Sequence, residues 1–330
     1  MSKLRLSIAI GDYDRNRALL DGRVQIDGVD PIFMALSPEE MFFRAFRHQD
    51  FDISEVSFAS QLVSMAQDRS QYQALPIFLS RAFRHSSIYI RTDKGIESPA
   101  DLRGRSIGIA EYQLSANVWA RALLEDEYGV RPAEIRWVRG GMNTAGRPEK
   151  LKVELPPEIR IDNAPDDRSL DDLLSAGEID GFIGPRSLRC FDDGHPKVAR
   201  LFGNGVEVAS AYWRKTGIFP IMHLLGVRRE LFEAHPFLGG ALMKAFTRSK
   251  QFAEEMLSDT SATKVTMPFV EDHLAEARRL MGRDFWSYGV AGNEKTIKAF
   301  LDHHHRQGLS SRRIALDELF PARVRESYSL

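Results

Sequence analysis

The chain has 330 residues, of which 43% are hydrophobic, and its formal net charge is −1. This charge predicts neither a nucleic acid nor an anionic membrane as partner, and no apolar run approaches the roughly 20 residues that span a bilayer. Cys190 is the single cysteine, which excludes an intrachain disulfide and a cysteine-based metal cluster. These properties fit a cytoplasmic α/β protein and leave its function open.

The first segment, MSKLRLSIAIGDYD, is compatible with two structures. Lys3 and Arg5 are positive, as at the start of an export signal. Such a signal needs a continuous apolar stretch of about 7–15 residues, whereas apolar and other residues alternate here from Leu4 to Ile10 before Gly11. Alternation is typical of a strand. We therefore predict a first strand and a cytoplasmic protein.

Helices and strands alternate in the first two thirds of the chain. Ser37 is expected to cap a helix that starts at Pro38, with Glu40 completing a capping box. Ser98 and Pro99 repeat this device. The further predicted elements are a strand in FDISEVSFAS, a strand from residue 106 to 110, a helix in LSANVWARALLEDEYG, a strand in RWVRGG, a helix in RSLDDLLSAG and a strand through FI before GP.

The remaining segments differ in pattern. PEKLKVELPPEIRIDNAPDDRS is rich in proline and charge, and we expect a surface excursion there, with a hairpin as one form. From about residue 215 the pattern is mostly helical. The helices are predicted in LFEAHPFLGGALMKAFTRSKQFAEEML, VEDHLAEARRLMG and NEKTIKAFLDHHHRQG.

The order of DLRGRSIGIAEY, a helix and AGEIDGFIGP resembles the second lobe of type II periplasmic solute-binding proteins. The resemblance implies an α/β fold of two lobes, each a mixed sheet flanked by helices, with the ligand cleft between them. Residues 1–95 and 213–330 would form lobe 1, and residues 96–212 would form lobe 2. A cleft beyond the carboxyl ends of parallel strands fits the general rule for ligand sites in α/β sheets.

A narrower resemblance is to the 4,5-dihydroxyphthalate decarboxylase family. The segments that carry it are FRHSSIYIR, AEYQLSANVWARALLEDEYGV, YWRKTGIFPIMH, FWSYGVAGNEKT and QGLSSRRIALDELF, within roughly residues 4 to 320. The resemblance implies a carboxy-lyase of phthalate degradation that releases CO2 from 4,5-dihydroxyphthalate and leaves protocatechuate. Such a reaction needs a group that holds carboxylates, a base for the hydroxyl para to the departing carboxylate, and an acid for the ring carbon.

Histidine suits both proton transfers near neutral pH. The resemblance favours His85 and His223 as catalytic, although the residues alone also allow a solvated loop His85 and a strand His223 that serves the core. Glu111 follows a strand directly and is expected to accept a hydrogen bond from a catechol hydroxyl; the alternative is a cap or a solvated side chain. His304 is a further candidate, with His305 as the alternative. Three adjacent helical histidines cannot converge on one metal ion, and at most one of them can face a cleft.

The expected substrate-binding residues lie in loops at strand ends or next to aromatic segments. Arg84 and Arg186 would take carboxylates, and the start of a helix near Ser115 would favour an anion. An acidic residue such as Asp12 or Glu55 would orient a catalytic histidine. The complete set is Asp12, Ser57, Arg84, Tyr112, Gln113, Ser115, Arg186, Thr216, Phe219, Trp286 and Tyr288. For Phe219, Trp286 and Tyr288, core packing is the alternative.

Two other hypotheses stay open. One is a solute-binding protein for a small acid that feeds a transporter without catalysis. The other is a decarboxylase with a divalent metal as electron sink, although no metal ligands are assigned and we expect no cofactor, because a phenol para to the carboxylate is an internal sink. The expected partner is a small aromatic acid, with neither nucleic acid nor membrane, and a homo-oligomer is compatible with the sequence.

Overall fold

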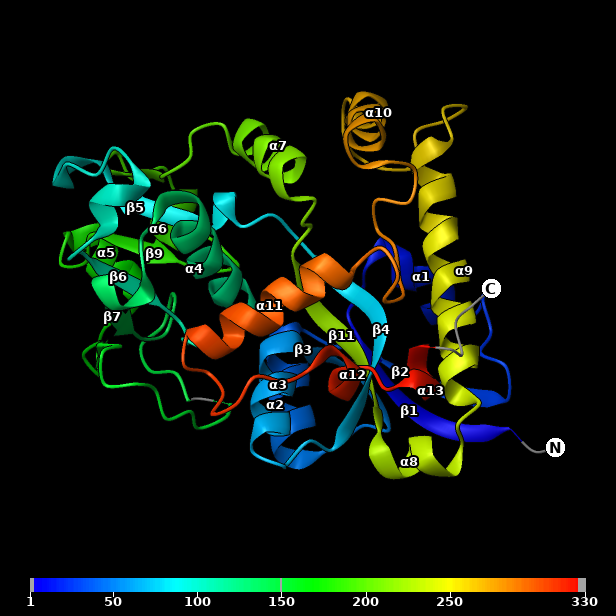
Figure 1. Cartoon of the computed structure of the whole chain (residues 1–330). Coiled ribbons are helices and arrows are strands. Elements are labelled where there is room, and N and C mark those ends of the chain that lie inside the picture. Colours follow the sequence, from blue (N-terminus) through cyan, green and yellow to red (C-terminus); the bar gives the residue numbers. More distant parts are fainter. Residues whose placement is uncertain (1–2, 149, 326–330) are drawn as a thin grey trace. The chain divides into compact units, whose positions relative to one another are not determined.

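The computed structural model describes residues 3–148 and 150–325. The chain divides into two compact units, each with one sheet and its own helices (Figure 1). Unit 1 comprises the described residues of Met1–Arg81, His223–Ile297 and Ile314–Leu330, and unit 2 comprises those of Ala82–Met222 and Lys298–Arg313. The predicted fold class, two mixed sheets flanked by helices, is confirmed.

The unit boundaries differ from the expected positions at 95/96 and 212/213. The chain enters unit 2 earlier, because β5 (Ile88–Arg91) already pairs with two strands of the unit 2 sheet. Residues 298–313 return to unit 2, where Gln307 accepts a hydrogen bond from Arg121 at 2.7 Å. Local patterns did not reveal this third crossing, since it depends on packing between segments almost 190 residues apart.

The unit 1 sheet has the strand order β2-β1-β3-β11-β4. Strand β1 runs parallel to β2 and β3, and β11 runs antiparallel to β3. Every residue of β3 is buried, as expected for a central strand covered on both faces. The bounds are Leu4–Ile10 for β1, Val29–Ala35 for β2, Ile53–Ser57 for β3, Tyr72–Arg81 for β4 and Ile221–Arg228 for β11.

Local sequence signals set the bounds of unit 1 helices, as one cap and one proline show. The Ser37 hydroxyl accepts a hydrogen bond from the Glu40 backbone N–H, and Pro38 begins α2. The helix predicted in LFEAHPFLGGALMKAF is interrupted at Pro236, because proline disfavours the helical conformation of the preceding residue. The helices are α1 (Asp14–Leu20), α2 (Pro38–His48), α3 (Phe58–Ala66), α8 (Arg229–Ala234), α9 (Leu238–Ser258), α10 (Val270–Met281), α12 (Leu316–Leu319) and α13 (Ala322–Arg325).

The unit 2 sheet has the order β10-β5-β9-β6-β7-β8. Strand β8 arises in the proline-rich segment and runs parallel to β7. The suggested hairpin is therefore wrong for this pair, because a hairpin would make the two strands antiparallel. The bounds are Ile88–Arg91 for β5, Ser106–Ile109 for β6, Arg136–Arg139 for β7, Ile161–Asn163 for β8, Gly181–Ile183 for β9 and Val198–Arg200 for β10.

Short helices surround this second sheet. Ser169 and Asp172 form a reciprocal capping box at the start of α5, and Gly177 ends that helix with a φ of 75°. The segment after Ser98 forms a 3₁₀ turn, η3, instead of an α-helix. The helices are α4 (Ser115–Tyr128), α5 (Leu170–Ala176), α6 (Arg189–Asp192) and α7 (Gly205–Thr216), with turns η1 (His85–Ser87), η2 (Thr92–Lys94), η3 (Pro99–Leu102) and η4 (Pro132–Glu134). Helix α11 (Glu294–Arg306) spans the third boundary, between Ile297 and Lys298.

Candidate active site

Three neighbouring strands of unit 1 bring polar residues to one edge of the sheet. Gly11 follows β1, Ser57 ends β3, and His223 lies near the start of β11. Because β1 and β3 are parallel, their carboxyl ends meet at this edge. The antiparallel register places His223 opposite Ser57. Residues more than 160 positions apart therefore share the place where α/β sheets usually bind ligands.

Glu55 is the buried acceptor at this edge. Its side chain is 0% exposed in the middle of β3. One carboxylate oxygen, Oε2, accepts a hydrogen bond from the Gly11 backbone N–H at 3.0 Å, and the other, Oε1, accepts one from the Tyr13 hydroxyl at 3.0 Å. Burying a carboxylate is costly unless such donors surround it. A third donor completes the arrangement, namely the ring of His223.

His223 and Glu55 form a close pair. The Nδ1 atom of His223 lies 2.6 Å from Glu55 Oε1. Because a carboxylate can only accept, this contact places a proton on Nδ1 and leaves the Nε2 lone pair of the neutral ring available. Phe42 packs edge-on against the imidazole, with ring centroids 4.7 Å apart. The His223 side chain remains 17% exposed. The pair has the arrangement of a general base with an orienting carboxylate.

The loop after β1 needs glycine at position 11, because the Tyr13 ring packs closely against it. A Cβ atom on Gly11 would lie 2.3 Å from the Tyr13 ring, which is closer than nonbonded atoms approach. Glycine therefore allows Tyr13 to fold back over the loop and to reach Glu55 with its hydroxyl. The Asn16 amide donates to the Gly11 carbonyl at 2.9 Å and fixes the other side of the loop.

Arg15 is a neighbour of this pair that sequence reasoning missed. Its guanidinium carbon lies 4.2 Å from the Tyr13 ring centroid and 4.4 Å from that of Trp286. Its Nε donates to the Leu79 carbonyl at 2.7 Å. One signal was available in the sequence: Arg15 is a cation in the first turn of a helix, where the helix dipole disfavours positive charge.

The other unit 1 candidates are Asp12, Ser57, Trp286 and Tyr288, and the first three have defined partners. Asp12 is exposed and pairs with Arg17 at 3.0 Å. The Ser57 hydroxyl caps α3 by accepting from the Ser60 N–H. Trp286 Nε1 donates to the Phe78 carbonyl at 2.8 Å. The hydroxyl of Tyr288 is buried without a hydrogen-bond partner in the described part of the chain, and burial raises its pKa.

In unit 2, Glu111 is neither a cap nor a solvated side chain. It is 1% exposed just after β6, and its Oε1 atom accepts from Arg147 at 2.9 Å and from Lys150 at 3.2 Å. Its second oxygen, Oε2, is buried without a hydrogen-bond partner among the described residues. Both cations come from the loop after β7, so this carboxylate ties that loop to the end of β6.

His85 is buried beside aromatic rings, and Arg84 is partly exposed with a buried Nε atom. Burial lowers the Arg84 pKa to about 10, and its Nε lacks a partner in the described structure. Burial also lowers the pKa of His85 to about 4. The His85 ring lies 5.5 Å from both Phe202 and Tyr212, and neither ring nitrogen has a hydrogen-bond partner within residues 3–148 and 150–325.

Tyr112, Gln113 and Ser115 are all buried near the start of α4. The Tyr112 ring lies 3.6 Å from the Arg121 guanidinium carbon, and burial raises the tyrosine pKa. The Gln113 side chain donates to the Leu151 carbonyl at 2.7 Å. This segment therefore packs against the interior of unit 2 and against the loop after β7.

The last unit 2 candidates have different surroundings. Arg186 is exposed. Thr216 caps the end of α7, where its hydroxyl donates to the Tyr212 carbonyl at 2.7 Å. Phe219 packs on Phe83 with ring centroids 4.9 Å apart. His304 is 0% exposed, and its Nδ1 lies 3.2 Å from the hydroxyl of Ser310, which also belongs to unit 2.

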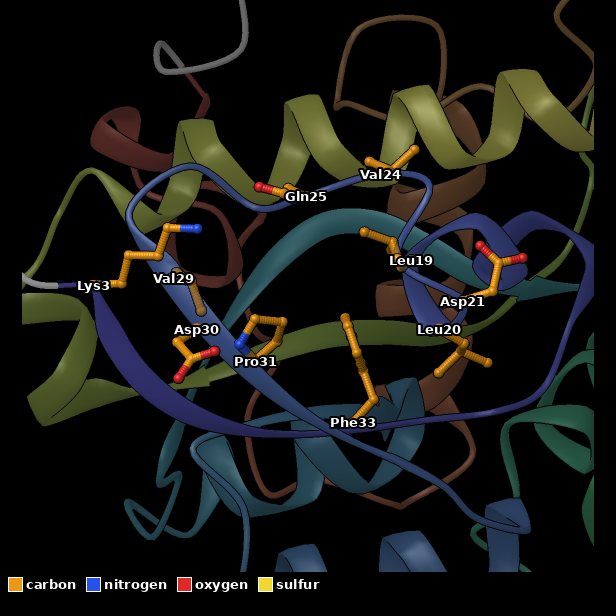
Figure 2. A pocket seen from close by; sticks show the side chains of 11 residues that line it. Lys3, Leu19, Leu20, Asp21, Val24, Gln25, Val29, Asp30, Pro31 and Phe33 are labelled. Carbon is orange, nitrogen blue, oxygen red and sulfur yellow. The ribbon is translucent and has the colours of Figure 1, made fainter.

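A separate pocket of about 380 Å³ opens beside the edge strand β2 of unit 1 (Figure 2). Leu19 and Val29 contribute apolar walls, and Lys3 and Asp30 contribute charges. None of the predicted site residues lines it. Within the described ranges, we find no helix with the length and apolarity needed to cross a membrane. The same residues contain no group of three or more His, Cys, Asp or Glu side chains placed to hold a metal ion.

Comparison with known proteins gives two levels of similarity. Residues 28–145 match the family model of the periplasmic substrate-binding protein of phosphonate ABC transporters. The solved structure of the aliphatic sulphonate-binding protein SsuA of Escherichia coli has a TM-score of 0.53 and 11% identity, with 96% of this chain and 91% of that chain covered. This similarity concerns the fold and agrees with the predicted two-lobed class.

Two curated relatives are much closer in sequence. A 4,5-dihydroxyphthalate decarboxylase of Comamonas testosteroni is 56% identical over 330 residues, which cover 100% of both chains. A 4,5-dihydroxyphthalate decarboxylase of Pseudomonas putida is 54% identical over 214 residues, which cover 65% of this chain and 83% of the relative. The first of these alignments covers the residues of both units.

Proposed function

Because the chain belongs to the 4,5-dihydroxyphthalate decarboxylase family, we propose that it removes one carboxylate of 4,5-dihydroxyphthalate as CO2 and leaves protocatechuate. The observation that carries the mechanism is the Glu55–His223 pair, in which a buried carboxylate holds one nitrogen of a partly exposed imidazole. Such a pair can accept a proton from a phenol, as phenolate formation requires. The reaction would belong to the degradation of phthalates.

His223 Nε2 takes the proton of the hydroxyl para to the departing carboxylate. The electron pair of the broken O–H bond moves toward the ring and raises the electron density at the carboxylated carbon. A proton adds to that carbon, the C–CO2 bond breaks, and its electron pair restores the aromatic ring. The imidazolium then returns its proton to the oxygen, so that each turnover consumes one proton from solvent. Glu55 stabilises the imidazolium while it exists.

The decisive experiment mixes chelator-treated protein with 4,5-dihydroxyphthalate and follows CO2 release and the ultraviolet spectrum. We expect turnover to protocatechuate without added metal, because the phenol itself accepts the electron density. Activity that is lost on chelation and restored by a divalent metal would contradict the metal-free proposal. Absence of turnover in both conditions would contradict the decarboxylase proposal.

A second candidate is a binding protein for a small acid without catalysis. The observation in its favour is the match of residues 28–145 to a transporter substrate-binding family, together with the fold of SsuA. Tight and saturable binding of 4,5-dihydroxyphthalate without release of CO2 would favour it. A buried carboxylate that holds a histidine nitrogen at 2.6 Å suits proton transfer better than simple binding.

We place this reaction in the cytoplasm. Residues Leu4–Ile10 form β1, which pairs with β2 and β3 in the site-bearing sheet. Loss of this run through cleavage would remove the strand that positions Gly11 and Tyr13. Cell fractionation, with the native protein followed by antibody, tests the location; recovery from the periplasm would contradict it.

A further inference from the structure

Arg15 is held more rigidly than a surface arginine. Its side chain is only 15% exposed. Both Nε and Nη2 donate to the Leu79 carbonyl, and the guanidinium lies over the rings of Tyr13 and Trp286. Cation–π contacts of this kind fix the position of a guanidinium group. Arginine usually loses considerable side-chain entropy on binding a ligand, and here most of that loss has already occurred during folding.

The two rings that hold Arg15 are themselves anchored. Trp286 Nε1 donates to the Phe78 carbonyl at 2.8 Å, next to the residue that binds Arg15. The Tyr13 hydroxyl donates to Glu55 at 3.0 Å. The same tyrosine therefore contacts the guanidinium with its ring and the carboxylate of the His223 pair with its hydroxyl.

The guanidinium retains unused donor capacity. It has five N–H groups, and the Leu79 carbonyl takes one from Nε and one from Nη2. Among the described residues, the Nη1 side has only Asp14 as a polar contact, at 3.3 Å, and that carboxylate is 57% exposed. Exposed ion pairs of this type contribute little energy. The Nη1 and Nη2 hydrogens thus present a fork that matches a carboxylate of a ligand.

From this arrangement we propose that Arg15 is a specificity residue that binds the carboxylate the substrate retains. The proposal rests on the decarboxylase function proposed above. A substrate hydroxyl at His223 and a carboxylate at Arg15 would lie on either side of Tyr13. A cation on the departing carboxylate would stabilise the ground state and oppose the loss of CO2, whereas a cation on the retained carboxylate binds ground state and transition state alike.

The test uses two ligands that differ only in this carboxylate, protocatechuate and catechol. Dissociation constants are measured by titration calorimetry for the wild type, for R15M and for the control R23M, which removes an exposed arginine of unit 1 that pairs with Asp21. We expect R15M to weaken protocatechuate binding about 10- to 100-fold, the size of a lost charged hydrogen-bond pair. Catechol binding and both R23M affinities should change less than about 3-fold.

Kinetics gives a second measurement. A group that binds the ground state and the transition state equally contributes uniform binding. Removal of such a group raises KM and leaves kcat nearly unchanged. We therefore expect a raised KM for 4,5-dihydroxyphthalate in R15M, and a partial return toward the wild-type value in R15K, which keeps the charge but not the fork.

Two outcomes would overturn the role of Arg15. An unchanged preference for protocatechuate over catechol in R15M would show that another group binds the carboxylate. Equal weakening of both ligands would show that Arg15 only supports the pocket. If the wild type does not decarboxylate the substrate, the proposed function fails. If the wild type turns over and R15M still prefers protocatechuate over catechol as the wild type does, only the role of Arg15 fails.

Discussion

His223 of unit 1 and His85 of unit 2 were both predicted to be catalytic, and their environments are opposite. His223 has a carboxylate at 2.6 Å and a side chain that is 17% exposed. His85 is 2% exposed, with aromatic rings around it and no hydrogen-bond partner for either ring nitrogen among the described residues. Burial lowers the pKa of His85 to about 4.

The difference shows what makes a histidine useful for proton transfer. A carboxylate stabilises the imidazolium that forms when the ring accepts a proton, and an accessible second nitrogen lets the substrate approach. His85 lacks both in unit 2, and its pKa is low because burial desolvates the charged ring more than the negative charge of Glu127 stabilises it. The geometry therefore favours His223 as the proton-transfer group.

The largest expected effect is the loss of His223. Replacement by glutamine keeps a polar side chain but cannot take up a proton, so we expect kcat/KM to fall about 1000-fold, within the range for general acid–base catalysis. Decarboxylation is followed by CO2 release. The matched control is H273Q, which removes an exposed histidine on α10 and should retain wild-type activity. Equal activity in H223Q and wild type would remove His223 from the mechanism.

Replacement of Glu55 by glutamine should have the next largest effect. The E55Q side chain has nearly the same shape, but it no longer compensates the charge of the imidazolium or fixes the Nδ1 proton. We expect kcat to fall about 100-fold, with little change in the far-ultraviolet circular dichroism. An increase in KM without a decrease in kcat would show that Glu55 serves binding only.

His85 is expected to affect stability through its pH dependence. Its folded-state pKa, about 4, lies below the unfolded value of about 6.5. The unfolded chain therefore binds the proton first as the pH falls, and the free energy of unfolding decreases between about pH 6.5 and pH 4. Relative to H85F, which cannot titrate, the wild type should lose on the order of 2 kcal/mol across this window. Urea unfolding at several pH values measures this loss. The same pH dependence of the free energy of unfolding in wild type and H85F would contradict the environment assigned to His85.

The smallest effect concerns Tyr13. The Y13F variant removes one of the hydrogen bonds to Glu55 but keeps the ring against Gly11 and Arg15. A single hydrogen bond of this kind contributes about 1 kcal/mol, which corresponds to about a 5-fold decrease in kcat/KM. The measurement compares kcat/KM for 4,5-dihydroxyphthalate with urea unfolding of the same variant. A purely structural role of Tyr13 would lower the free energy of unfolding and leave kcat/KM unchanged.

Several parts of the site were accessible from sequence. The sequence predicts His223 and Asp12 as site residues and offers Glu55 as a residue that orients a histidine. The pairing of Glu55 with His223 was not accessible, because β11 returns to the sheet more than 160 residues after β3. Arg15 was missed because its partners, Leu79 and Trp286, come from distant segments.

The sequence by itself determined the elements and the family. Alternating residues from Leu4 to Ile10, the Ser37 cap and the Gly177 stop act within a few residues, so local physics specifies them. Only the tertiary structure decided which polar groups meet. Tertiary packing gave Glu111 two cations and His223 a carboxylate, and it left the ring nitrogens of His85 without a hydrogen-bond partner among the described residues. Proton affinity depends on solvent access and neighbouring charge, and both are set by segments that are remote in the chain.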